Sequence, residues 1–251
     1  MYQFDKSILL DHLSWPQVEK KIKSGWTTIV LGIGSTEQHG PHLPLFVDAF
    51  CGDVIPHEVA KKLGFILQAP TIRVGCSEAH MGFPGTITIS ENTLKALIQE
   101  YCESLAKHGF QKIILIPTHG GNFKAVQEVA KKLEKSLTST QVLGFADFDG
   151  LMHRFHEATE KFKVTKEEAG LHGGEIETSF MMHIAPEFVD STKLDQGVPV
   201  YTSIAEVYKK GTKVLSPSGV LGIPLKANAS KGKEYLAAYV DCVLEFIKKG
   251  A

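Results

Sequence analysis

The sequence predicts a three-layer α/β/α fold built around a largely parallel central sheet. Continuous apolar runs alternate along the 251-residue chain with segments whose apolar residues recur at helical spacing. Such alternation is typical of strand–helix–strand units, which form parallel sheets covered by helices. No repeat or linker-like tract interrupts it, and the length suits one large domain. We therefore expect a single domain over residues 1–251.

Four apolar runs are the expected strands. Each run is continuous, as in strands that helices cover on both faces, and does not alternate between apolar and polar residues. They are TTIVLGI (27–33), FILQAPTI (65–72), KIILIPT (112–118) and QVLGFADF (141–148).

Helices are expected between and after these runs. One should lie between Ser90, which can cap its N-terminus, and Gly109, which can end it. A second is expected within 122–137, and a third closes the chain around 236–247, because apolar residues recur there every three or four positions. Residues 185–229 contain four prolines, and we expect loops and short strands there.

The bulk composition excludes several classes of function. The formal net charge is −1, from 27 basic and 28 acidic residues, so no basic field attracts nucleic acid or an anionic membrane. No apolar run approaches the ~20 residues of a membrane span, and the N-terminus lacks a signal-peptide layout. We expect a cytoplasmic protein that acts on a small-molecule substrate, with neither nucleic acid nor a membrane as partner.

Three polar segments follow three of the expected strands. They are STEQHGPHLPLFVD, GCSEAHMGFPGT and THGGN. In open α/β sheets, ligands bind beyond the carboxyl ends of the strands. If these strands are parallel neighbours, the three segments meet at one rim of the sheet, and we expect the functional site there.

The first and third segments carry a candidate metal site. Glu37 and His39 lie two residues apart on a chain leaving a strand, so they point to the same side. The Gly–Pro turn returns Asp48 to the rim, and His119 comes from the third segment. Mixed carboxylate and imidazole ligands suit Zn²⁺, Mn²⁺ or Fe²⁺, and grouped buried charges are costly unless a cation pairs them. An aspartate flanked by ligands can bridge two ions, as in two-metal hydrolases.

A fourth cluster, GLHGGEIETSFMM (170–182), is typical of a loop that enters a helix. Glu175 and Glu177 would lie about 200° apart around that helix. Only one of them can then reach the metals, while the other makes structural contacts. Acidic residues placed to suit a helix dipole are the alternative, but this explanation does not cover the neighbouring His172.

Taken in order, these motifs resemble the creatininase (creatinine amidohydrolase) family. The matching segments are GSTEQHGPHLPLFVD, the FPGT of GFPGTITIS, THGGN, HGGEIETS and SGVLGIPLKANASKGK, which span most of the chain. The resemblance implies an α/β fold, often assembled as a homohexamer, with two divalent metal ions, zinc together with manganese or iron. Known members cleave C–N bonds in cyclic or formyl amides; some are implicated in peptide trimming, and one branch opens a keto-inositol ring.

The resemblance also implies metal ligands by position. Glu37, His39, Asp48 and His119 match the family's ligands, with Asp48 as the bridge. In creatininase itself the remaining ligand, a glutamate, lies two residues after the ligand histidine, where this chain has glycine. Relatives with HGGN use the first glutamate of the later HxGExETS motif, which is Glu175 here.

Five further residues are candidates for roles beside the metals. His172 resembles the family's catalytic or substrate-polarising histidine, and Ser77 resembles a substrate contact. His80 is a second candidate for contact with substrate, although a hydrogen-bonded loop histidine is an equal alternative. Gln38 and Glu177 are candidates for orienting the metal ligands.

The expected activity is hydrolysis of the C–N bond of an amide, cyclic amide or formamide by water activated at two metal ions. True creatininases hold their substrate with tryptophans just before the HxG motif. The only tryptophans here are Trp15 and Trp26, so creatinine is not the expected substrate. The alternatives are ring opening of a cyclic ketone such as a keto-inositol, peptide trimming on the same metals, and a binding module whose metal only supports the fold.

Overall fold

A parallel four-stranded sheet lies at the centre of the computed structural model, which describes residues 1–199 and 203–250. The strands lie side by side in the order β2-β1-β3-β4. In register, Thr28 pairs with Ile66 on one side and with Lys112 on the other. The chain order therefore reverses between β1 and β3, which is where parallel α/β sheets bind ligands. Their bounds are β1 Thr28–Ile33, β2 Ile66–Gln68, β3 Lys112–Pro117 and β4 Gln141–Gly144.

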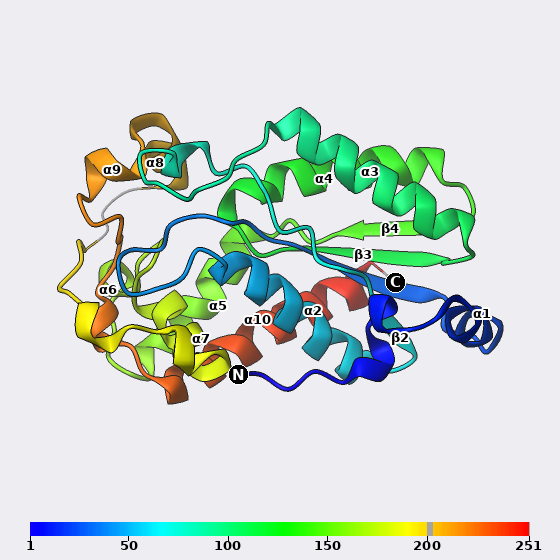
Figure 1. The fold of residues 1–251 in the computed structure, drawn as a ribbon, viewed down its shortest axis with the longest axis horizontal. Helices are drawn as coiled ribbons and strands as arrows, with labels where there is room; N and C mark the ends of the chain where they lie inside the picture. The colour runs from blue at the N-terminus through cyan, green and yellow to red at the C-terminus, as the bar shows by residue number, and fades with distance from the viewer. Residues whose placement is uncertain (200–202, 251) are drawn as a thin grey trace.

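Helices cover both faces of this sheet (Figure 1). Side chains alternate along each strand, so Ile29 and Leu31 pack under α3 and α4, while Val30 packs with the opposite layer. The expected three-layer α/β fold is confirmed. The first layer is α3 (Glu91–Lys107) and α4 (Phe123–Ser136); the second is α2 (Val47–Leu63), α5 (Phe148–Glu160), α7 (Glu175–Ile184) and α10 (Ala229–Lys249).

Local sequence signals determine both ends of helix α3. The Ser90 hydroxyl accepts a hydrogen bond from the Thr93 amide at 3.1 Å, which caps the N-terminus as expected. At the other end, Gly109 adopts a φ of +99°, a conformation that favours glycine and turns the chain towards β3. Leu94, Ile98 and Leu105 are buried against the sheet.

Three predicted segments differ from the structure. The run 65–72 forms only the short strand β2, which ends at Gln68. The run 141–148 is divided, because β4 ends at Gly144 and the Asp147 side chain accepts the Gly150 amide hydrogen bond that starts α5. In the described part of 185–229, helices and 3₁₀ turns take the place of the short strands. The shorter elements of the chain are α1 (Trp15–Lys23), α6 (Lys166–Ala169), α8 (Ile204–Lys210), α9 (Thr212–Leu215) and the 3₁₀ turns Lys6–Ile8, Leu10–His12, Glu78–His80, Gly120–Asn122, Pro186–Phe188, Ser191–Lys193 and Pro224–Lys226.

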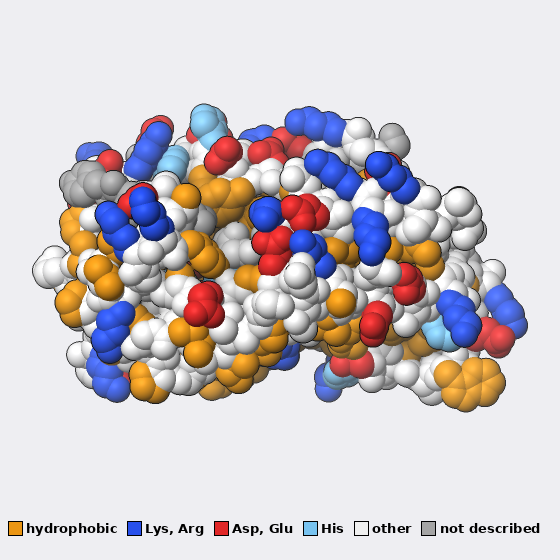
Figure 2. Space-filling view, turned by 90° about the horizontal axis from the view of Figure 1, so that it is seen from above, with side chains coloured by type: hydrophobic (Ala, Val, Ile, Leu, Met, Phe, Trp, Pro, Cys, Tyr) orange, Lys and Arg blue, Asp and Glu red, His pale blue; other side chains and the backbone are white. Residues whose placement is uncertain are grey.

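The outer surface of α3 and α4 carries charges of both signs. Figure 2 looks onto this side and shows basic and acidic side chains interspersed among apolar ones. Ion pairs connect the two helices, as between Lys95 and Glu128 at 2.9 Å. Among the described residues, no helix is long and apolar enough to cross a membrane.

Two glycines bring α2 against the end of β1. A Cβ at Gly32 would overlap the backbone oxygen of Gly52 in α2, and one at Gly34 would lie 2.5 Å from the backbone oxygen of Asp48. Packed backbone atoms cannot move away from an added methyl group as the end of a flexible side chain can. The close approach therefore places the first turn of α2 beside the loop that follows β1.

Gly32→Ala should destabilise the protein because the new methyl group would overlap the backbone of Gly52 in α2. We expect the free energy of unfolding to fall by about 1–3 kcal/mol or more, seen as a drop of several degrees in Tm. Gly250→Ala is the matched control, since its φ is −98° and the added Cβ would lie 3.3 Å from the flexible Leu143 side chain and no closer than 3.7 Å to the backbone oxygen of Phe246. Equal Tm values for the two variants would contradict this packing.

Candidate metal centre

The site lies where β1 and β3 end side by side. Ile33 pairs with Pro117 at the last position of these strands. Glu37 follows β1, and His119 follows β3, so both reach the switch point of the sheet. Asp48 stands in the first turn of α2, where the helix N-terminus favours a carboxylate.

Four side chains form a compact buried cluster there. Glu37, His39, Asp48 and His119 are each at most 6% exposed. His119 Nδ1 lies 3.3 Å from Glu37 Oε1 and 3.2 Å from Asp48 Oδ2. The other oxygen of Asp48, Oδ1, lies 3.4 Å from His39 Nε2. Asp48 thus stands between the two histidines and offers one oxygen to each.

Several polar atoms of this cluster have no hydrogen-bond partner among the described residues. They are both carboxylate oxygens of Glu37, Nε2 of His39 and Oδ2 of Asp48. Buried polar atoms without partners are costly, and native structures keep few of them. A divalent cation among these atoms would satisfy all of them, so the donor set fits a metal.

The two histidines are also held by their other nitrogens. His39 Nδ1 lies 3.1 Å from the backbone oxygen of Glu37, and His119 Nε2 lies 3.0 Å from that of Cys76. A carbonyl oxygen can only accept, so these nitrogens carry the protons. His39 Nε2 and His119 Nδ1 therefore face the carboxylates and can bind a metal once they lose their own protons, as in histidines that bind metals.

The structure reverses the expected placing of the two glutamates of α7. Glu177 Oε2 lies 3.6 Å from His39 Nε2, and His39, Asp48 and Glu177 form one of the groups whose ligand atoms lie within 4.8 Å of one another. Glu175, the expected ligand, faces the opposite way. Its carboxylate contacts Ser179, Lys231 and Tyr235 at 3.0, 3.3 and 2.9 Å.

The helix angle explains why the two glutamates point apart and why their spacing alone does not choose between them. The two glutamates lie on opposite sides of α7, as their spacing requires. Which side faces the cluster depends on how α7 packs against α10 and α2, and spacing along one helix does not contain that information. Glu177 is fixed towards the cluster by the Gly173 amide, which donates to its Oε2 at 2.5 Å.

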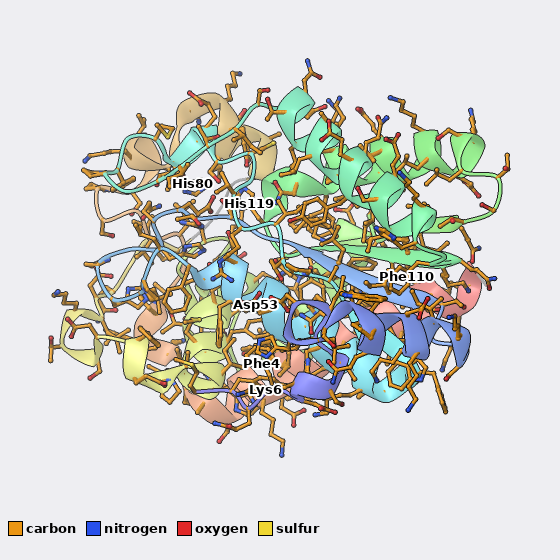
Figure 3. All side chains as sticks on the ribbon, turned by 45° about the vertical axis from the view of Figure 1, so that its right-hand side comes forward. Phe4, Lys6, Asp53, His80, Phe110 and His119 are labelled. Atoms are coloured by element: carbon orange, nitrogen blue, oxygen red, sulfur yellow. The ribbon has the colours of Figure 1, made fainter. Side chains whose placement is uncertain are left out.

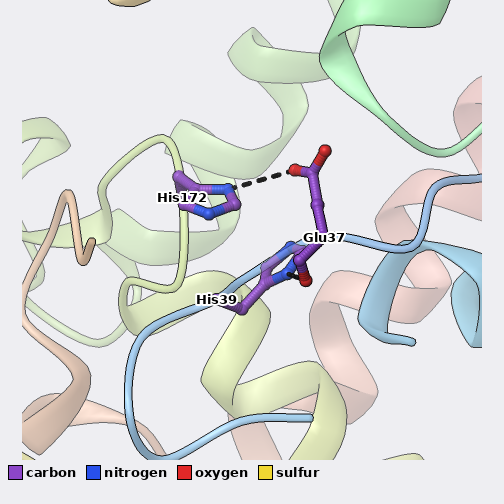
Figure 4. A group of neighbouring side chains, drawn as sticks. All are labelled: Glu37, His39 and His172. Carbon is purple, nitrogen blue, oxygen red and sulfur yellow. Dashed lines mark hydrogen bonds and ion pairs between the residues drawn. The ribbon is translucent and has the colours of Figure 1, made fainter. Parts of the chain in front are cut away.

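Three imidazoles stack along one side of the cluster. His172 lies between His39 and His80, with ring centroids 4.2 and 4.1 Å away. His172 Nδ1 faces Glu37 Oε1 at 3.6 Å (Figure 4). Figure 3 shows His80 and His119 converging on this site from two different loops. His80 and His172 therefore reach the cluster, as the sequence predicts.

Gln38 supports this stack. Its side-chain carbonyl accepts the Gly40 amide at 2.9 Å, and its amide nitrogen donates to Gly219 O at 3.2 Å. The same amide nitrogen lies 3.2 Å from His80 Nδ1, and the backbone oxygen of Gln38 lies 2.5 Å from His172 Nε2. Gln38 thus orients the two histidines beside the cluster rather than the four residues that form it.

Ser77 is not at the surface of the site. It is fully buried, and its hydroxyl is hydrogen-bonded to that of Ser35. Its backbone amide donates to Thr88 Oγ1 at 2.9 Å. Ser77 lines neither of the two pockets beside the cluster, so its expected contact with substrate differs from the structure.

In the cluster, burial and the charges of neighbouring side chains shift the pKa values of Glu37, His39 and Glu177 in opposite directions. Burial alone would raise the pKa of Glu37, but the neighbouring His119 lowers it to about 2. Burial would lower the pKa of His39, but Asp48 and Glu177 raise it to about 10. Burial dominates at Glu177 and raises its pKa to about 7. A cation among the carboxylates would replace the proton of His39, so metal binding here competes with protons.

His80 and His172 are neutral at physiological pH. Burial lowers the pKa of His80 to about 4. Burial and the neighbouring His80 and His39 also hold the pKa of His172 well below its usual range. Neutral imidazoles beside a carboxylate–metal cluster can accept or donate a proton during a reaction.

Tyr208 of α8 is a site residue that the sequence did not reveal. Its hydroxyl donates to Cys76 O at 2.5 Å and lies 3.1 Å from His119 Nε2. A Cβ at Gly121 would overlap this hydroxyl oxygen. The tyrosine therefore fills the space beside Gly121, two residues after His119, and leaves no room for a side chain there. Its segment lies in the proline-rich region where we expected loops and strands, so no local signal indicated it.

A parallel α/β sheet with buried carboxylates and imidazoles at its switch point defines a metal-dependent hydrolase. The family model for creatininases, described as creatinine amidohydrolase, matches residues 11–247. The chain therefore belongs to the creatininase family, as its motifs predict.

Two curated relatives and one solved structure show what the chain is similar to. A mycofactocin precursor peptide peptidase from Mycobacterium ulcerans (strain Agy99) is 32% identical over 237 residues, which cover 89% of this chain and 86% of the relative. A creatinine amidohydrolase from Pseudomonas putida is 24% identical, with 97% of each chain covered. A mutant creatininase of Zn-Zn type superposes with a TM-score of 0.78 at 23% identity, over 97% of this chain and 98% of that chain. The higher identity to the peptidase agrees with the expectation that this is not a true creatininase.

Tyr208→Phe should weaken metal binding while leaving the fold intact. The variant loses the hydroxyl that contacts the histidine of the cluster, and losing such an outer contact typically costs about 10–100-fold in metal affinity. Competition with a chelating indicator measures the dissociation constant for zinc. Tyr101→Phe, on α3 and far from the site, is the control and should bind as the wild type does. An unchanged affinity in the Tyr208 variant would show that the tyrosine does not position His119.

Proposed function

We propose that this enzyme hydrolyses the C–N bond of an amide and holds two divalent metal ions for that purpose. The observation that carries the proposal is the set of buried carboxylate and imidazole atoms that have no hydrogen-bond partner in the described part of the chain. When bound, such ions lower the pKa of water and polarise a carbonyl oxygen. The metal identities and the homohexamer implied by the resemblance, and the cytoplasmic location expected from the sequence, remain predictions.

Two overlapping groups of residues fit two neighbouring ions. One consists of Glu37, Asp48 and His119, and the other of His39, Asp48 and Glu177. The two oxygens of Asp48 face different histidines, which suits a bridging carboxylate. We therefore assign Glu177, in place of Glu175, as the fifth ligand.

His172 is suited to move a proton during the reaction. Its Nε2 lies 2.5 Å from the Gln38 carbonyl oxygen and 2.9 Å from the Gln38 side-chain nitrogen; the shorter contact is to an atom that can only accept, which favours a proton on Nε2. The lone pair of Nδ1 then faces Glu37 and the centre of the site. A neutral imidazole in this tautomer can take a proton from the attacking water and pass it to the leaving nitrogen.

Similarity to a precursor peptide peptidase favours a peptide bond among the possible amides.

Gln38 and His80 fix the position of His172, so the proton acceptor is held beside the cluster before substrate binds. Holding catalytic groups in place reduces the entropy cost of reaching the transition state.

The proposal is tested with zinc- or manganese-loaded enzyme and a panel of formamides, cyclic amides, short peptides and a keto-inositol. NMR should detect C–N cleavage of at least one amide class. Asp48→Asn should lower that rate by 10²–10³-fold or more, on the order of the loss of a single electrostatic group in other enzymes.

Asp53→Asn is the control on the same helix, because Asp53 pairs with Arg73 at the partly exposed end of β2 and not with the cluster. It should retain the wild-type rate. Turnover of the keto-inositol alone, or full amide turnover in the Asp48 variant, would refute the proposal.

A further inference from the structure

An apolar chamber leads from the metal centre into the layer of α2, α5, α7 and α10. Its volume is about 100 Å³, several times the ~10–15 Å³ that a single water needs on such a measure. Asp48, His172 and Glu177 form one end of it. The rest of its wall is dominated by the side chains of Phe123, Phe148, Leu151, Met152, Phe155 and Phe180.

Away from the metal centre, the polar side chains of this wall are already engaged. The Thr118 hydroxyl donates to the backbone oxygen of Asp48 at 2.8 Å, and the Tyr239 hydroxyl donates to that of Pro117. Burial raises the pKa of the Cys51 thiol well above its usual range, so the thiol is neutral. A hydroxylated or charged group placed here would lose its hydration without gaining a side-chain partner, which is costly.

The chamber opens at one side and meets a second pocket at the other. Phe148 and Met152 are only half-buried, unlike Leu151 and Phe155, so they form the mouth. The second pocket lies towards Tyr208 and His80. Five residues line both spaces, namely Asp48, Gly120, Leu171, His172 and Glu177. The cluster therefore sits at the junction of the two, where a substrate can extend into both.

We propose that the chamber binds an apolar side group, aromatic or branched aliphatic, next to the amide bond that is cut. This inference rests on the proposed function and names the substrate class for it. Each methylene buried in the chamber should improve binding about fourfold, from the free energy of apolar transfer. The chamber also disfavours a keto-inositol, since the hydroxyl groups of such a ring would meet an apolar wall.

Binding is tested without turnover by ¹⁹F NMR of the metal-loaded enzyme. The probes are 4-fluorophenylacetamide and fluoroacetamide, which share the amide but differ in the ring. We expect the aromatic amide to bind at least tenfold more tightly. Met152→Gln, which places a polar group at the mouth, should weaken its binding at least threefold. Met182→Gln is the matched control on α7, outside the chamber, and should bind as the wild type does.

Equal binding of the two probes, or an unchanged affinity in the Met152 variant, would overturn the proposal. A series of hydrolysis measurements distinguishes this proposal about the chamber from the proposed function. The rates of ammonia release from N-acetyl amides of glycine, alanine, leucine and phenylalanine should rise in that order. Equal hydrolysis rates for all four side chains would support the proposed amide hydrolysis and refute the role of the chamber. Selective probe binding without any amide hydrolysis would support the role of the chamber and refute the proposed function.

Discussion

The buried contact of Asp48 with two histidines is the constraint on which the site depends. Carboxylates and imidazoles are packed within 3.2–3.4 Å of one another and almost completely withdrawn from water. Such a group is expensive to bury unless a cation pairs its charges. The fold meets this demand at the switch point of the sheet, where Gly32 and Gly34 let α2 approach β1 closely enough to place Asp48 there.

A second buried network holds the other side of the centre in place. Glu175 receives a hydrogen bond from Tyr235 at 2.9 Å and lies 3.3 Å from the ammonium of Lys231, which ties the first turn of α7 to α10. Because Glu177 is on the opposite side of that same turn, this anchoring fixes its carboxylate towards His39. The two glutamates of one motif thus serve different ends: one secures the helix, and the other faces the cluster.

The sequence predicted what depends on local pattern and missed what depends on packing. The strands follow from apolar runs, and α3 follows from its apolar spacing and the cap at Ser90. All of these signals lie in residues that are close together in the sequence. The meeting of Glu37, Asp48 and His119 followed from the rule that loops after parallel strands share a rim. The choice between Glu175 and Glu177, and the arrival of Tyr208 from α8, depend on contacts between distant segments, which spacing along the chain does not encode.

The central claim is that the cluster is a metal centre completed by Glu177. The most direct measurement is the number of divalent metal ions bound per chain, by elemental analysis of wild type, Glu177→Gln and Glu175→Gln after equilibration with zinc. We predict two ions for the wild type and for the Glu175 variant, and fewer for the Glu177 variant. A wild type without bound metal, or a Glu177 variant that keeps both ions while the Glu175 variant loses one, would contradict the account.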